Sequence, residues 1–269
     1  MSRIFVSVRR TVMSRIFVSV IIVSFLLIAI QPVQAQYSYN PAPPVQQEPG
    51  AVGKLDVNFS SEYIWRGMEL NHQFVMQPSA RISESGFELE AIGNLDMSSS
   101  NENRGKFTRW IYRAGLAKRS REGSAAISYI YYDNKHLGFA KTQEIALEIS
   151  YGYPFFGGGD VYYDFDNAGG FYFRTIMGYM GDLGPLRIIP KLTIGYATSH
   201  YQDYYFGVSE TSFLDVVVSL KAEFNIVSGL YIYLEGDYYE LAKSGLRHSE
   251  ENIQQGENFY WQGGVDFRF

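Results

Sequence analysis

The sequence predicts an all-β fold: a transmembrane antiparallel up-and-down β-barrel of about 12 strands with both termini in the periplasm. Three observations lead to this fold class. Segments in which apolar and polar residues alternate recur along the chain, 16% of the residues are aromatic at a mean hydropathy of -0.14, and the last residue is a phenylalanine. Membrane helices would be apolar throughout and would raise the mean hydropathy, whereas a membrane strand needs only one apolar face.

The chain begins with an expected export signal over residues 1–35. Four arginines, the last of them Arg15, lead into the apolar run 16–30, and a small-residue cleavage site follows at 33–35. The octet MSRIFVSV occurs at Met1 and again at Met13, so either methionine is a candidate start. Without residues 1–35 the chain keeps 19 basic residues (23 minus four) against 28 acidic ones, a formal net charge of -9. This charge disfavours nucleic acid as a partner.

Residues 36–53 hold four prolines among Gln and Asn and show no apolar periodicity. We expect them to form a flexible, Pro/Gln-rich periplasmic lead-in, with the barrel over residues 54–269. Twelve alternating segments lie in the barrel region, most of them roughly 8 to 13 residues long, which suits a tilted strand that crosses the hydrocarbon layer. The expected strands are 55–65, 74–82, 87–97, 108–117, 125–132, 142–152, 160–166, 171–180, 186–197, 214–225, 230–239 and 258–269.

The connections between these segments alternate in length. Outer-membrane barrels place short turns on the periplasmic side and long loops outside, and an even strand number brings both termini to the periplasm. The expected short turns are 83–86, 119–123, 154–159, 181–185 and 227–229. The expected long, polar loops are 98–106, 134–141, 198–212 and 241–257. Two short connections, 68–73 and 167–170, break the alternation.

The closing strand carries Phe259, Trp261, Val265 and Phe267 on one face. An uncovered last strand would aggregate, so we expect it to pair antiparallel with the first strand and seal the barrel. The ending resembles the C-terminal signature strand of bacterial outer-membrane barrels. That resemblance makes Phe267 and Phe269 the expected assembly signal, which the barrel assembly machinery of that membrane recognises.

The three tryptophans are predicted to form part of an aromatic girdle on the lipid-facing surface. Trp65 ends a strand that rises from the periplasm, whereas Trp110 and Trp261 begin descending strands, so all three are expected at one level and on the outward face. A soluble β-sandwich or lipocalin-like barrel would alternate too, but it would leave Arg, Lys, Glu and Tyr side chains outside.

Several short motifs cluster in the first three segments. They are Ser61-Glu62-Tyr63-Ile64-Trp65-Arg66-Gly67, then Gln77-Pro78, Glu84-Ser85-Gly86-Phe87 and Gly93-Asn94-Leu95-Asp96. Over about 45 residues these motifs resemble the TorF-like porin family of Gram-negative outer membranes, which carries an S-x-Y-x-x-R-G element, an S-G-F strand opening and a G/S-N-x-D closing. The resemblance implies a barrel with a pore and names no substrate.

Charged residues of both signs fall on the inward parity of the strands. An Arg or Lys on the lipid face would cost about 2 to 4 kcal/mol at mid-bilayer, so these charges are expected to face the lumen. If strands eight to ten lie opposite strand three, basic groups would face acidic groups across the bore and select small charged or zwitterionic solutes. The alternative is that each charge pairs with a neighbour. The lumen-facing candidates are Glu88, Glu90, Arg113, Arg174, Arg187, Lys191 and Lys221.

The position of Arg66 also allows two interpretations of its role. At the outer end of the first expected strand it is a candidate pore-mouth residue, and the alternative is a structural partner of inward acids or of polar groups on the lipopolysaccharide side.

A catalytic or metal site finds little support in the sequence. The chain has no cysteine, and the calcium-loop-like stretch that starts at Asp164 lacks the fifth and twelfth ligands, so we expect no cofactor and no metal. His72, His136, His200 and His248 all fall in expected outer loops. A hydrolase would need one of them beside a serine and an orienting polar group, and Ser199 or Ser249 would point to the opposite face from its neighbouring histidine.

The leading hypothesis is an outer-membrane, porin-like channel for passive diffusion of small hydrophilic solutes, charged ones included, and not an enzyme. The alternatives are an outer-membrane barrel that hydrolyses lipid or peptide, and a closed structural or interaction barrel. The expected partners are outer-membrane lipids and lipopolysaccharide, the barrel assembly machinery and small solutes. The sequence leaves open which solute passes, whether the lumen is open and what the oligomeric state is.

Overall fold

The computed structural model describes residues 51–98, 102–120, 122–242 and 257–269. The predicted export signal and all of the predicted lead-in up to residue 50 lie outside the described residues. So do residues 99–101 and 243–256 of two predicted loops, and with them His248 and Ser249.

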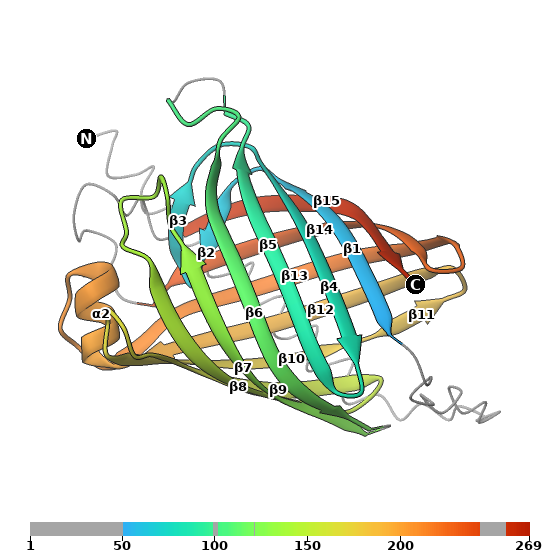
Figure 1. The fold of residues 1–269 in the computed structure, drawn as a ribbon. Helices are drawn as coiled ribbons and strands as arrows, with labels where there is room; N and C mark the ends of the chain where they lie inside the picture. The colour runs from blue at the N-terminus through green and yellow to red at the C-terminus, as the bar shows by residue number, and fades with distance from the viewer. Residues whose placement is uncertain (1–50, 99–101, 121, 243–256) are drawn as a thin grey trace, which may run out of the picture. The chain divides into compact units, whose positions relative to one another are not determined.

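In the described part of the chain, twelve antiparallel strands form one closed ring (Figure 1). Each strand pairs with its neighbours in chain order, β10 pairs with β12, and β1 pairs with β15 to close the ring. The predicted antiparallel up-and-down β-barrel and its strand number are therefore confirmed. The ring strands are β1 Val52–Ser60, β4 Val75–Glu84, β5 Phe87–Asp96, β6 Phe107–Arg119, β7 Gly123–Asp133, β8 Thr142–Tyr151, β9 Phe155–Asp164, β10 Gly170–Tyr179, β12 Leu186–Ala197, β13 Ser212–Val227, β14 Leu230–Leu241 and β15 Glu257–Arg268.

The seam between β1 and β15 keeps one register along its length, from Lys54 opposite Arg268 to Ser60 opposite Gln262. The backbones of Gly53 and Phe269 exchange two hydrogen bonds of 2.7 and 3.0 Å. The strand thus begins at Val52, inside the predicted lead-in 36–53 and before the predicted strand start at residue 55, because Ser83 pairs with Val52 and Phe269 bonds to Gly53. We call the end of the barrel with Val52 and Phe269 the terminal end, and the opposite end the loop end.

The outer face of the ring is apolar. Large aliphatic side chains such as Leu116 and Leu234 are exposed, by 60% and 59%, and exposed aromatic side chains accompany them near both ends. The inward positions carry the polar and charged side chains. This division is what alternation in a membrane barrel requires, because lipid covers the outer positions and the inner ones meet water or each other.

The chain leaves the wall between β1 and β4, which corrects the predicted first strand 55–65 and the predicted short connection 68–73. β1 ends at Ser60, and β2 Tyr63–Trp65 and β3 Met68–Asn71 form a separate two-stranded sheet. Arg66 and Gly67 join them as a two-residue turn with φ values of +51° and +78°, the left-handed conformations that a tight hairpin turn demands. The alternation simply continues from β1 into β2, so it could not mark this departure.

Two other predicted connections differ from the structure. The expected turn 154–159 is mostly strand, since β9 begins at Phe155 and Gly158 and Gly159 pair with both neighbouring strands. The expected loop 198–212 contains the helix α2 Ser199–Phe206, which ends at Gly207 with a left-handed φ of +65°. A short strand, β11 Gly181–Leu183, extends the wall beside β12 at the terminal end. The described residues include no helix with the length and apolar character needed to span a membrane.

Candidate pore

The lumen contains a cavity of about 510 Å³, which we call the lumen cavity. Its lining comes from the tip of the β2–β3 hairpin and from strands all around the ring. Four of the seven predicted lumen charges line it: Glu90, Arg113, Arg174 and Lys191. The other three, Glu88, Arg187 and Lys221, are not among its lining residues.

The charges that the wall strands contribute to the lumen cavity pair with neighbours along the wall and not across the bore. Arg113 donates two hydrogen bonds of 2.8 Å to the Glu148 carboxylate. The other pairs also join residues on adjacent or next-but-one strands: Arg81 with Glu90 at 3.0 Å, Arg174 with Asp160 at 2.6 Å, and Lys191 with Glu235 at 3.0 Å. The arrangement is the neighbour pairing that the sequence left open as the alternative to a transverse field.

The three remaining predicted charges also have local partners. Glu88 accepts a hydrogen bond from Arg119 of the adjacent strand. Lys221 lies 3.9 Å from Glu223, with its Nζ atom 4.1 Å from the centre of the Tyr233 ring.

Arg187 contacts Asp182 at 2.6 Å and Glu223 at 3.8 Å. Its hydrogen bond lowers the pKa of the exposed Asp182 carboxyl group below the usual value.

Two carboxylates of the lumen cavity, Asp215 and Asp237, form no ion pair with a described residue. Asp215 accepts a hydrogen bond of 3.1 Å from the Tyr172 hydroxyl group, and Asp237 accepts one of 3.0 Å from the Gln262 amide. Both residues are 2% exposed. Every arginine and lysine that lines the cavity has a carboxylate partner. When Glu144 and Asp160, the partners of Arg66 and Arg174, are counted with the acids of the lining, carboxylates outnumber basic groups, and the two without an ion pair lie on the β13–β14 wall.

Arg66 lies at the tip of the hairpin, inside the lumen. Its two terminal nitrogens donate hydrogen bonds of 2.7 and 2.8 Å to the two oxygens of Glu144 on β8, and one of them also donates to the Tyr201 hydroxyl group at 2.8 Å. The side chains of Arg66 and Glu144 are 8% and 0% exposed. Arg66 is therefore the structural partner of an inward acid, and its predicted place at the end of the first strand is wrong.

Aromatic rings enclose the Arg66 guanidinium group. Its central carbon lies 4.2 Å from the centre of the Tyr162 ring and 4.7 Å from those of Tyr172 and Trp65. These distances are within the range of cation–π attraction, which strengthens when water is excluded.

Trp65 is not part of a lipid-facing girdle, which corrects the prediction. Its ring packs inside the barrel against Tyr132 and Tyr205, and the Arg109 guanidinium group stacks on it at 4.1 Å. The prediction failed because it counted Trp65 as the end of a wall strand. Trp261 is 44% exposed, and Trp110 stacks on Phe107 with ring centres 4.6 Å apart.

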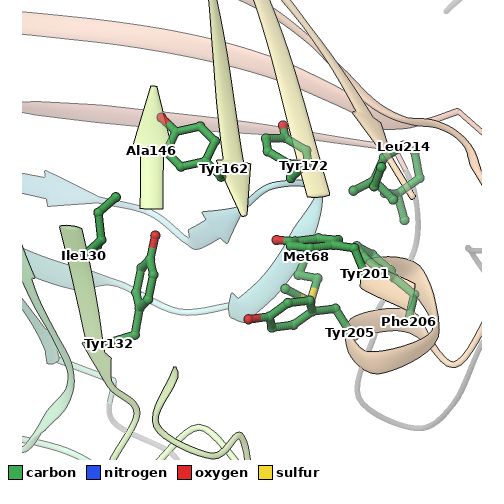
Figure 2. Close-up of a cluster of buried hydrophobic side chains, with 12 residues drawn as sticks. Met68, Ile130, Tyr132, Ala146, Tyr162, Tyr172, Tyr201, Tyr205, Phe206 and Leu214 are labelled. Carbon is green, nitrogen blue, oxygen red and sulfur yellow. The ribbon is translucent and has the colours of Figure 1, made fainter. Parts of the chain in front are cut away.

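The helix α2 completes the packing at the loop end. Tyr201, Tyr205 and Phe206 of α2 pack with Met68 of the hairpin and Leu214 of β13 in one buried cluster (Figure 2). The Tyr205 hydroxyl group donates a hydrogen bond of 2.8 Å to Asp164 of β9. Sequence reasoning missed these tyrosines, although their i, i+4 spacing inside an otherwise polar predicted loop was a signal for one apolar helix face.

The side chains of the predicted assembly signal lie at the terminal end. The rings of Phe267 and Phe269 stack with centres 5.4 Å apart, and both are exposed, by 42% and 64%. The Phe269 ring lies over Gly53, where a larger residue would collide with it. The ring thus sits at the rim of the closed seam.

The described histidines form no catalytic arrangement. His72 follows the hairpin, His136 lies between β7 and β8, and His200 is in α2. No hydrogen bond in the described part of the chain joins one of their side chains to a serine, and no group of acids and histidines there could hold a metal ion.

The structure is similar to solved structures of porins. It matches a NanC porin with a TM-score of 0.52 at 12% identity, covering 79% of this chain and 98% of that one. It matches a KdgM porin in complex with disordered oligogalacturonate with a TM-score of 0.52 at 11% identity (80% and 99% covered), and another KdgM porin structure with a TM-score of 0.50 at 11% identity, with the same coverage. No protein-family model and no curated protein matches the sequence. At these identities the likeness concerns architecture, and the fold is that of an outer-membrane porin barrel.

Proposed function

We propose that this protein is an outer-membrane channel through which small hydrophilic solutes diffuse passively. The observation that carries the proposal is a barrel with an apolar outer face around a lumen cavity lined by charges of both signs. A buried protein core would exclude such charges, whereas a water-filled path needs them. Because the hairpin and α2 occupy the loop end of the lumen, we take this structure as the shut state of the channel.

The proposal is tested by single-channel recording in planar bilayers with refolded protein that shows heat-modifiable gel mobility. We expect discrete current steps with low open probability, since the loop end is shut in the resting structure. Heat-denatured protein is the control and should give none. A folded barrel that never conducts, either intact or with its hairpin removed, would contradict the channel and favour the closed structural barrel.

The surplus carboxylates lead us to expect a preference for cations. In a potassium chloride gradient the reversal potential should favour K⁺ over Cl⁻, because Asp215 and Asp237 form no ion pair with a described residue and add to the paired carboxylates of the cavity. Asp237→Asn should lower the permeability ratio about twofold or more. Asp203→Asn, an exposed change on α2 away from the cavity, is the control. An anion preference in the unaltered protein would refute this charge assignment.

We further propose that the terminal end faces the periplasm and the loop end faces outside. Because the chain has no cysteine, single cysteines report the orientation cleanly. In intact cells a membrane-impermeant thiol reagent should label Asp203→Cys on α2, whereas Glu122→Cys in the terminal-end turn should react only after the outer membrane is opened. Both positions are exposed in the barrel. If intact cells label Glu122→Cys but not Asp203→Cys, the terminal end faces outside and the proposed orientation is wrong.

The resemblance of the motifs near Arg66 and Gly93 supports a place beside the TorF-like porins. In that setting we propose outer-membrane lipids, lipopolysaccharide and the barrel assembly machinery as partners. The exposed apolar wall and the exposed Phe269 support the first and the last of these.

A further inference from the structure

We propose that the β2–β3 hairpin is a releasable plug, that Arg66 locks it in the lumen, and that α2 is a latch which holds the lock from the loop end. This inference rests on the proposed channel function. It adds to the channel a hairpin that moves and an exposed surface, on α2, through which that movement can be driven.

The hairpin crosses the bore. It leaves the wall at Ser60 of β1 and returns at Val75 of β4. Its tip binds Glu144 on β8, which is five strands from β1 and four from β4 in the ring of twelve. The tip also reaches the β13–β14 wall, where a side chain at Gly67 would collide with Leu241 and Asp215. A segment that is tethered on one wall and fastened on the others blocks the path between them.

The hairpin can leave without opening the barrel wall. β2 and β3 pair with one another in a sheet of their own, and the ladder of the ring closes without them, since Ser60 and Val75 are already register partners of β1 and β4. The turn at Arg66 and Gly67 gives the hairpin its own fixed shape. Release therefore exchanges side-chain contacts for water and leaves the ring of strands intact.

Two arginines fasten the hairpin, one from each side of the contact. Arg66 of the hairpin binds Glu144 of the wall, and Arg109 of the wall stacks on Trp65 and donates a hydrogen bond of 3.1 Å to the Tyr63 hydroxyl group of the hairpin. A buried arginine is stable only while its partners stay in place, because an unpaired charge in a dry site is costly. These contacts therefore hold the hairpin firmly only while all of them are present, and the loss of any one partner destabilises the bound hairpin.

The helix α2 supplies two members of the lock. The Tyr201 hydroxyl group accepts a hydrogen bond from Arg66, and the Tyr205 ring packs edge-on against Trp65 at 5.3 Å. The same helix exposes His200 and Asp203. Both tyrosines are held by one short helix, so any force that lifts α2 from the loop end removes them together. The geometry thereby couples an exposed surface to the plug.

The test compares two lock variants with a matched control in planar bilayers. The double variant Arg66→Met/Glu144→Leu removes the buried pair without leaving a lone charge, and Tyr201→Phe removes only the hydrogen bond between α2 and Arg66. We expect open probability to rise about tenfold in the first and about two- to threefold in the second. Arg187→Met/Asp182→Leu, the same double change at an ion pair that does not touch the hairpin, should match the unaltered protein.

A second readout does not depend on current. Thr193→Cys places a single thiol in the lumen cavity, beyond the hairpin from the loop end. An impermeant thiol reagent applied to intact cells should label this cysteine at least about tenfold faster in the Arg66→Met/Glu144→Leu background than in the otherwise unaltered protein.

Equal open probability and equal labelling in all variants would overturn the plug and leave the channel standing. Faster labelling in the lock variant without current from any variant would keep the plug and refute the channel. Tyr201→Phe remains informative if the double variant fails to fold, and an unchanged open probability and labelling rate in folded Tyr201→Phe would refute the latch role of α2.

Discussion

The single substitution Glu144→Leu is expected to expel the β2–β3 hairpin from the lumen while the twelve-stranded ring stays folded. Arg66 would remain charged in a site where its side chain is 8% exposed, without its carboxylate partner. Removing one member of a buried ion pair costs about 3 to 5 kcal/mol. Because the hairpin shares no strand ladder with the wall, expulsion relieves this cost without breaking the ring.

Limited trypsin digestion followed by mass spectrometry measures the effect. Cleavage after Arg66 should be absent from the folded unaltered protein and appear in the variant, with heat-modifiable gel mobility retained. Glu90→Leu is the control, since Arg81 is 34% exposed and can be solvated when its partner is lost. A Glu144→Leu barrel that stays resistant at Arg66 but unfolds at lower temperature would show that the pair stabilises the ring and not the plug.

The substitution Phe269→Asp is expected to reduce folded barrel in cells about tenfold or more while leaving refolding in detergent nearly unchanged. The ring of Phe269 is 64% exposed, so its loss removes little burial from the folded barrel, and the backbone bonds to Gly53 persist. The terminal aromatic residue is needed for recognition by the assembly machinery under our proposal.

Heat-modifiable gel mobility, measured in cell envelopes and in detergent, separates these two effects. Phe155→Asp is the control, because Phe155 is similarly exposed, at 58%, but lies on β9 and not on the closing strand. If Phe269→Asp inserts at unaltered levels in cells, the last residue is not the assembly signal. If it fails equally in detergent, its role is structural.

The wall of this barrel could be predicted from the sequence because lipid and lumen impose opposite demands on alternate residues. That rule located the closing strand, its pairing with β1 and the inward parity of Glu90, Arg113 and Arg174. It failed at 61–71, because the strands of the plug also alternate and nothing in the period marks where the chain turns inward. The one local signal in the sequence there is Gly67, since glycine favours the left-handed conformation of the turn that the structure shows at Arg66 and Gly67.

The ion pairs could not be predicted for a different reason. Inward parity says that a charge faces the lumen, but its partner depends on strand stagger and side-chain reach. Glu144 shows this clearly, since its partner comes from the hairpin and not from a neighbouring strand. The glycines at 157–159 misled the turn assignment because glycine favours turns as well as close strand packing, and here Gly158 lies tightly against the backbone of Ile149.

The most direct test of the channel is to remove the hairpin. Ser60 and Val75 are opposite one another in the β1–β4 ladder, so an Asn-Gly turn in place of residues 61–74 would join the two strands as an ordinary two-residue hairpin. Single-channel recording of this shortened barrel should show long-lived openings with a conductance several times larger than that of the unaltered protein, since the hairpin no longer crosses the bore and α2 has lost Met68 and Trp65, against which its tyrosines pack. A shortened barrel that folds, inserts into the bilayer and passes no current would contradict the account.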